Sequence, residues 1–256
     1  MDISEEPQKT WPPRIWSLTS VILVAVVFIG IYIFMSVVVA LLMADAGSLS
    51  FGLSVLSIVA GIIAAVLAVL TGKAIGHFSW QEFGFRRTEK RWYWLALLIA
   101  PGLVVLRLLV AGLLLALFPD LGEGVEDLTG ILLGDYNTLQ MLLMAFLAAC
   151  VAPISEEMFF RGYVYGALRM KLPVWASILI GSAIFAGIHL LPLQMVTAFV
   201  IALVLAWLYE SSKSLVFCII LHVTNNALAL ILTVAATWLT EQFPDLTVLG
   251  LLFGGS

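Results

Sequence analysis

The chain is 256 residues long, is 62% hydrophobic and carries a formal net charge of -4. Only 11% of its residues are charged, far below the roughly 25% of a soluble domain, so a soluble globular protein is excluded. A nucleic-acid-binding protein is excluded as well, because phosphate recognition needs a basic face. The apolar runs are long and continuous rather than alternating, which favours helices over a β-barrel. The composition therefore predicts an all-α, polytopic transmembrane helical bundle in a lipid bilayer.

Seven apolar runs follow a short polar tail at residues 1–15. They predict membrane-spanning helices at about 18–43, 51–72, 92–118, from Leu139 onward, 173–191, 193–209 and 214–239. A further apolar stretch at 248–253 is too short to cross alone, since a span needs about 20 residues. It is either a partial eighth helix or an interfacial segment.

Basic residues indicate which helix ends face the cytoplasm. Ten of the twelve Lys and Arg residues fall in the N-terminal tail or in the loops between spans 2 and 3, 4 and 5, and 6 and 7. The other connecting segments hold acidic residues and neither Lys nor Arg. The positive-inside rule then places the N-terminus in the cytoplasm of a multi-pass cell-membrane protein, and the compact loops favour a bacterial one. Arg107 and Arg161 are the two exceptions, inside apolar segments.

Two adjacent carboxylates, Glu156 and Glu157, lie with Arg161 inside the fourth apolar run. Ionised side chains in a membrane are costly and usually mark a function. Positions four residues apart share a helix face, so we expect Glu157 and Arg161 to form a structural ion pair. Glu156 points about 100° away and lacks that partner, which suits it to general-base chemistry. The alternative is a network of all three residues that only fixes helix packing.

Two of the three histidines, His189 and His222, also lie in predicted spans, and Asn226 follows His222 by one helical turn. With Glu156 they form a hydrolytic set. A carboxylate and an imidazole can deprotonate water, while a second imidazole and a carboxamide can donate hydrogen bonds to an oxyanion. Glu156, His189 and His222 are also a possible zinc ligand set. The sequence lacks the H-E-x-x-H pattern of common zinc proteases.

Three motifs follow one another along the second half of the chain: Glu156-Glu157-x-x-x-Arg161, Phe185-x-x-x-His189 and His222-x-x-x-Asn226. Together and in this order they resemble the CPBP family, which includes the type II CAAX prenyl proteases and the bacteriocin-processing or immunity (Abi) proteins. We expect the catalytic core at 139–230 (helices 4–7), after a cytoplasmic tail at 1–15 and helices 1–3 with their loops at 16–138. The end of helix 7 and the C-terminal segment occupy 231–256.

The resemblance implies an intramembrane endopeptidase that acts on peptide or membrane-protein substrates. In the metal-free mechanism that it implies, Glu156 activates a water molecule with help from His189, while His222 and Asn226 hold the oxyanion. A metal-dependent mechanism with Zn²⁺ on Glu156, His189 and His222 is the alternative. An asparagine is a poor zinc ligand and a good oxyanion donor, which favours the metal-free roles.

Two other functions would use the same buried charges. A proton-coupled transporter would relay protons through the glutamates and histidines, but the sequence shows no inverted repeat of broken helices. A non-catalytic bacteriocin-immunity protein would keep the fold, but it has no need of the whole hydrolytic set.

The depths of the three candidate residues do not agree if every helix is straight and normal to the membrane. Counted at 1.5 Å per residue from the basic inner edges, Glu156 lies at about 20 Å, His222 at about 14 Å and His189 at about 27 Å. Helix tilt, a kink at Pro153 or a later start of the fifth span is needed to bring them together. We expect a polar cavity near mid-membrane, reached from the cytoplasm.

Overall fold

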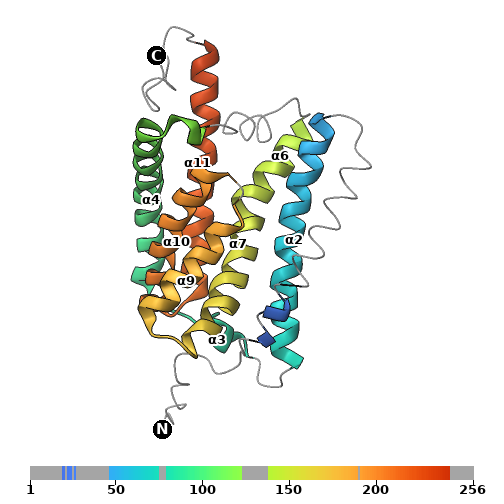
Figure 1. Ribbon diagram of the computed structural model, residues 1–256, viewed down its shortest axis with the longest axis vertical. Helices are drawn as coiled ribbons and strands as arrows, with labels where there is room; N and C mark the ends of the chain where they lie inside the picture. The colour runs from blue at the N-terminus through green and yellow to red at the C-terminus, as the bar shows by residue number, and fades with distance from the viewer. Residues whose placement is uncertain are drawn as a thin grey trace.

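The computed structural model describes residues 19–20, 22–24, 26, 46–74, 79–122, 138–189 and 191–242. All regular secondary structure in these ranges is helical, as the composition predicts. The helices, labelled as in Figure 1, are α2 (Ala46–Ala74), α3 (Trp80–Phe83), α4 (Lys90–Leu117), α6 (Thr138–Phe146), α7 (Ala152–Glu157), α8 (Gly166–Arg169), α9 (Val174–Gly187), α10 (Pro192–Ser212) and α11 (Leu215–Gln242).

Apart from the short α3, which lies in the connection between the second and third predicted spans, these helices correspond to the predicted spans from the second to the seventh. Within the described ranges, four helical segments are long and apolar enough to cross a membrane: Lys90–Leu117, Met141–Arg169, Pro192–Ser212 and Leu215–Leu239. The chain is therefore a multi-pass membrane protein built as a helical bundle. Most of the first predicted span, and the whole stretch at 248–253, lie outside the described residues.

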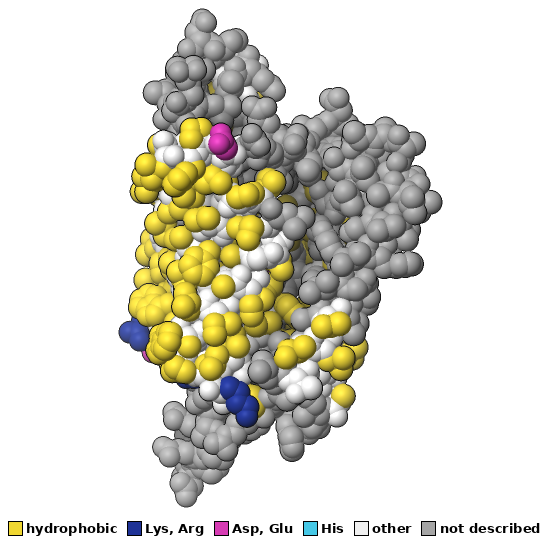
Figure 2. Space-filling model, viewed as in Figure 1, with side chains coloured by type: hydrophobic (Ala, Val, Ile, Leu, Met, Phe, Trp, Pro, Cys, Tyr) yellow, Lys and Arg dark blue, Asp and Glu magenta, His cyan; other side chains and the backbone are white. Residues whose placement is uncertain are grey.

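The outward surface of the bundle is apolar. Leu98 and Leu109 of α4, for example, are 73% and 67% exposed. Figure 2 shows an almost continuous hydrophobic face, with Lys and Arg side chains gathered at its lower end. A soluble protein rarely exposes so extensive an apolar surface, whereas lipid accommodates it. The basic end matches the charge bias along the sequence.

Helix α9 is shorter than the predicted span at 173–191, because it ends at Gly187. Pro192 begins α10 at a first-turn position, where its missing N–H costs nothing. A residue before proline disfavours the α conformation, and Leu191 is extended. His189 consequently lies in the short connection after α9 rather than within a continuous helix.

Residues 138–169 form one long helical rod with two wider, π-helical stretches. These are Leu147–Val151 and Met158–Tyr165, and they enclose the six-residue helix α7. Pro153, near the start of α7, has no N–H and its ring crowds the carbonyl of the preceding turn. The first wide turn lies directly before it and relieves that crowding. Such π-helical insertions are frequent at functional sites.

Helix α7 lies between α2 and α11 (Figure 1) and packs against both. Gly61 allows the close approach of α2, because a Cβ at this position would lie 2.9 Å from Ser155 Oγ of α7. Small residues at helix contacts in membranes permit such approach of two backbones. A Cβ at Gly61 would therefore displace the Ser155 hydroxyl, which donates to the Ala152 carbonyl at 2.9 Å.

A polar network ties the end of the rod to α10. Glu210 accepts hydrogen bonds from the Tyr165 hydroxyl at 2.7 Å and from Arg169 Nε at 3.2 Å. Lys213 Nζ lies 2.6 Å from the other carboxylate oxygen. Lys213 itself adopts a left-handed conformation, with φ of 53°, where α10 ends. This network fixes the rod against α10 at the basic end of the bundle.

Gly61→Ala should lower the free energy of unfolding by about 1–3 kcal/mol, because the new methyl group overpacks the α2–α7 contact. The thermal unfolding midpoint in detergent measures the effect. Gly102→Ala is the matched control: it also lies within a long helix, but a Cβ there would meet nothing within 4 Å. Equal midpoints for the two variants would contradict the proposed role of Gly61.

Candidate active site

The candidate residues come from three parts of the bundle. Glu156 and Glu157 end α7, and Arg161 lies in the π-helical stretch that follows. His189 follows α9, while His222 and Asn226 lie within α11.

Glu157 is the centre of the buried part of the site. Its Oε1 atom lies 2.9 Å from Arg161 Nη1 and 2.8 Å from His222 Nδ1. The side chains of these three residues are 0%, 3% and 6% exposed. The ion pair with Arg161 is the one that the four-residue spacing predicts. The contact with His222 was not predicted, and it gives Glu157 a second role, since the carboxylate orients the imidazole.

Glu156 lies on the other side of the same imidazole. Its Oε2 atom is 3.8 Å from His222 Nε2, and its side chain is 22% exposed. The two adjacent carboxylates therefore face different nitrogens of one ring, as the rotation of about 100° per residue allows. The Glu157 side chain is fully buried, whereas the Glu156 side chain is partly exposed and is not paired with Arg161.

The imidazole of His189 is oriented by the last turn of the preceding helix, α9. Its Nδ1 atom lies 3.0 Å from the carbonyl oxygen of Phe185. A carbonyl oxygen only accepts hydrogen bonds, so Nδ1 carries the proton and Nε2 of the neutral ring presents a lone pair. His189 is half-buried. In this tautomer it can accept a hydrogen bond from a water molecule.

The ring of Phe185 joins the two histidines. Its centroid lies 5.0 Å from that of His189 and 6.2 Å from that of His222. The Arg161 guanidinium lies 4.8 Å from the same ring, within the range of a cation–π contact. Packing on one aromatic side chain thus brings the motif of α9 together with those of α7 and α11.

The count along straight helices put the three motifs at different depths. Two features of the helices explain why the motifs nevertheless lie together. A π-helix has more residues per turn than an α-helix, so the count at 1.5 Å per residue overestimates the depth of Glu156 beyond Met158–Tyr165. Helix α9 has 14 residues and is about 21 Å long, which reduces the depth of His189 as well. Helix α9 begins at Val174, three residues after the Lys171 from which the depth was counted, so a later start of the fifth span contributes to this shortening.

Asn226 is held by a neighbour that the sequence reasoning missed. Asn225 Nδ2 donates to Asn226 Oδ1 at 3.3 Å, and Asn226 Nδ2 donates to the Ala148 carbonyl at 3.3 Å. A carboxamide nitrogen has two N–H donors, so one remains for a ligand. Asn225 is 3% exposed while Asn226 is half-buried. In the sequence, the only signal for this supporting role of Asn225 is its position directly before Asn226 in the third motif.

The tautomers of His189 and His222 suit metal binding, but the side chains of the candidate ligands are not placed around one point. His189 presents a free Nε2, and the Glu157–His222 contact resembles the carboxylate–histidine pairs that support metal ligands. Nevertheless, no three His, Cys, Asp or Glu side chains in the described ranges converge as a metal would require. The set Glu156, His189 and His222, suggested above as zinc ligands, therefore does not fit a zinc ion in this arrangement.

Arg161→Met should lower the free energy of unfolding by about 3–5 kcal/mol, because it leaves the Glu157 carboxylate buried without its partner. Arg91→Met is the matched control. Arg91 and Glu89 form a pair of the same length, 2.9 Å, but both side chains are 66% exposed, so the expected loss is under about 1 kcal/mol. Chemical denaturation in detergent measures both. A loss for Arg161→Met no larger than for the control would show that the buried charge is compensated elsewhere.

Comparison with known proteins gives two matches in this region. Residues 138–228 match the family model described as type II CAAX prenyl endopeptidase Rce1-like. The UPF0177 protein YxdF of Lactococcus lactis subsp. lactis (strain IL1403) is 24% identical over 104 residues, which cover 40% of this chain and 53% of that protein. The match thus spans about half the length of this curated relative. No solved structure matches the chain.

The family match covers all three motifs, from the glutamate pair in α7 to Asn226 in α11. Over residues 138–228 the chain therefore matches the family of type II CAAX prenyl endopeptidases, which confirms the resemblance that the three motifs indicate.

Proposed function

We propose that this protein is an intramembrane endopeptidase that hydrolyses peptide bonds of peptide or membrane-protein substrates. The observation that carries the proposal is the accessible carboxylate of Glu156, 3.8 Å from an imidazole that the buried Glu157 orients. The match of residues 138–228 to a peptidase family supports the same function.

In the proposed mechanism, Glu156 is the general base. A water molecule donates one hydrogen bond to the Glu156 carboxylate and another to Nε2 of His189. As its oxygen attacks the scissile carbonyl carbon, Glu156 takes a proton and the carbonyl oxygen becomes an oxyanion. The oxyanion then re-forms the carbonyl while the C–N bond breaks. Glu156 returns its proton to the leaving amine, so that the carboxylate is regenerated.

The oxyanion is held by His222 and Asn226. His222 Nδ1 donates to Glu157, so Nε2 carries a proton only when the ring is an imidazolium. We assign that charged form to His222 during the reaction, so that its Nε2–H faces the negative charge that develops on the oxyanion. Asn226 contributes the N–H that is not used by the Ala148 carbonyl. Donors held in position before the reaction stabilise a developing charge without reorganisation.

The proposal also includes the position of the site relative to the membrane. The N-terminus and the basic helix ends face the cytoplasm, and the compact loops favour a bacterial membrane. We place the catalytic core at 139–230 and expect substrates to reach it from the cytoplasmic side. In this proposal Glu156, His189, His222 and Asn226 act without a metal ion, which is supported by the lack of three converging zinc ligands among the described side chains.

Glu156→Gln should reduce kcat by about 10²–10⁴, the usual contribution of a general base, and leave the thermal unfolding midpoint unchanged. Cleavage of a peptide library by the full chain in proteoliposomes measures the effect, and the inactive variant can trap bound substrates. Retention of full activity would overturn the assignment. Stoichiometric zinc that is present in the wild type and lost in Glu156→Gln would instead support the metal-dependent alternative.

Asn226→Ala should reduce kcat by about 10²–10³ with a smaller effect on KM, because an oxyanion donor acts mainly in the transition state. Thr224→Ala is the control on the same helix, since the Thr224 hydroxyl donates only to the carbonyl of Ile220. Steady-state kinetics on the cleaved peptide separate kcat from KM. A rise in KM alone would assign Asn226 to substrate binding rather than to the oxyanion.

A further inference from the structure

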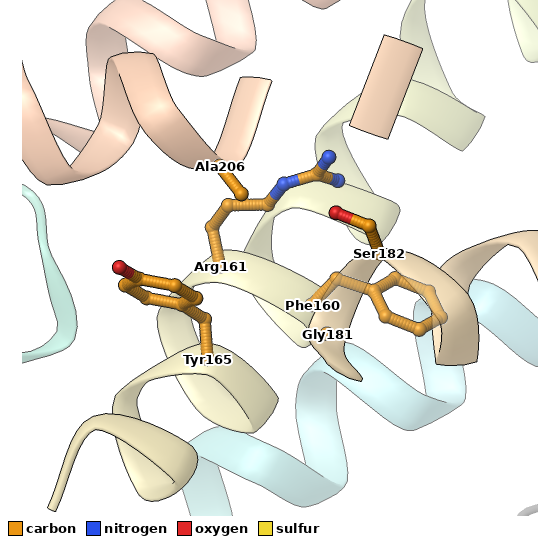
Figure 3. Close-up of a pocket in the computed structure, with 6 residues that line it drawn as sticks. All are labelled: Phe160, Arg161, Tyr165, Gly181, Ser182 and Ala206. Carbon is orange, nitrogen blue, oxygen red and sulfur yellow. The ribbon is translucent and has the colours of Figure 1, made fainter. Parts of the chain in front are cut away.

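A small cavity lies beside Arg161 of the ion pair. It has a volume of about 10 Å³ and is lined by Phe160, Arg161, Tyr165, Gly181, Ser182 and Ala206. Figure 3 shows the Arg161 guanidinium and the Ser182 hydroxyl pointing toward the same space, while the Tyr165 hydroxyl points away from it. The Tyr165 hydroxyl is already bonded to Glu210.

Two polar atoms at this cavity have no hydrogen-bond partner among the described residues. They are Arg161 Nη1 and Ser182 Oγ, and their side chains are almost fully buried, since the residues are 3% and 1% exposed. Arg161 Nη1 is close to Glu157 but is not aligned with it for a hydrogen bond. A buried polar group without a partner destabilises the folded protein. A group that bridges Arg161 Nη1 and Ser182 Oγ would supply a hydrogen-bond partner to both atoms.

Ser182 differs from the other buried serine and threonine side chains in the described helices. Ser155, Ser177 and Thr197 each donate to a carbonyl of their own helical segment, at 2.9–3.1 Å. This local bond is the usual choice of a serine or threonine within a helix. The Ser182 hydroxyl does not make it, and it points into the cavity instead.

We propose that this cavity holds one ordered water molecule, which accepts a hydrogen bond from Arg161 and exchanges another with Ser182. The volume is close to the ~10–15 Å³ that a single water needs. A cation is excluded by the guanidinium. An anion is disfavoured, because Glu157 already neutralises Arg161 and a second negative charge would lie uncompensated in a buried place.

The bridge makes Ser182 a positioning residue for the site. Arg161 is then held on three sides: by Glu157, by the ring of Phe185 and by the water on Ser182. Arg161 in turn fixes Glu157, which orients His222 at 2.8 Å. The chain of contacts runs from α9 through Arg161 and Glu157 to the imidazole in α11. The effect on catalysis rests on the proposed function, whereas the water site does not.

Ser182→Thr and Ser182→Val test this role, because the two side chains have nearly the same shape and differ in the hydroxyl group. We expect kcat of Ser182→Val to be about tenfold below that of Ser182→Thr, since a small misplacement of a catalytic group is costly, with KM values within about twofold. Ser177→Ala, which removes a buried hydroxyl bonded to its own helix, should retain the wild-type kcat. Equal kcat values for the Thr and Val variants would overturn the positioning role.

An experimental density map of the full chain in lipid nanodiscs tests the water directly. We expect a peak within hydrogen-bond distance of Arg161 Nη1 and Ser182 Oγ in the wild type, and no such peak in Ser182→Val. A well-resolved map without the peak, or with the Ser182 hydroxyl turned to its own helix, would overturn the proposal. If the wild type cleaves no peptide, the proposed function fails, and the density map alone decides the water site.

Discussion

The carboxylate of Glu157 is the constraint on which the site depends. A charge in this position is fully removed from water, and such a charge persists only when it is paired and hydrogen-bonded. Arg161 supplies the opposite charge one helical turn away, and His222 supplies a hydrogen bond from another helix. The need to satisfy one buried group therefore joins the rod at 138–169 to α11 and sets the orientation of the imidazole.

Neighbouring residues of the same type consequently have different properties. Glu156 and Glu157 are adjacent in sequence, yet one is 22% exposed and the other fully buried. The buried carboxylate has its interactions fixed and serves as support. The accessible one retains the freedom to bind water and exchange a proton. The same division holds for Asn225, which is buried and orients its neighbour, and for Asn226, which is half-buried with one donor unused.

The geometry of the backbone brings these residues to one place. The wide turns on either side of α7 shorten the rod relative to a regular helix, and α9 ends before His189 because Pro192 begins the next helix. Phe185 then contacts both imidazoles and the guanidinium. The Phe185 ring thus packs against the polar side chains and limits their movement, which a set of long, flexible side chains could not do.

The sequence by itself determined the helical membrane architecture, the helices from the second to the seventh span and the Glu157–Arg161 pairing. These follow from local properties: apolar run length, the distribution of basic residues and the four-residue spacing on one helix face. Only the tertiary structure decided that Glu157 orients His222, that Asn225 holds Asn226 and that Ser182 faces Arg161. Each of these contacts joins distant helices or depends on a side-chain rotation, and a count along straight helices misplaced the residues because it could not include the π-helical turns.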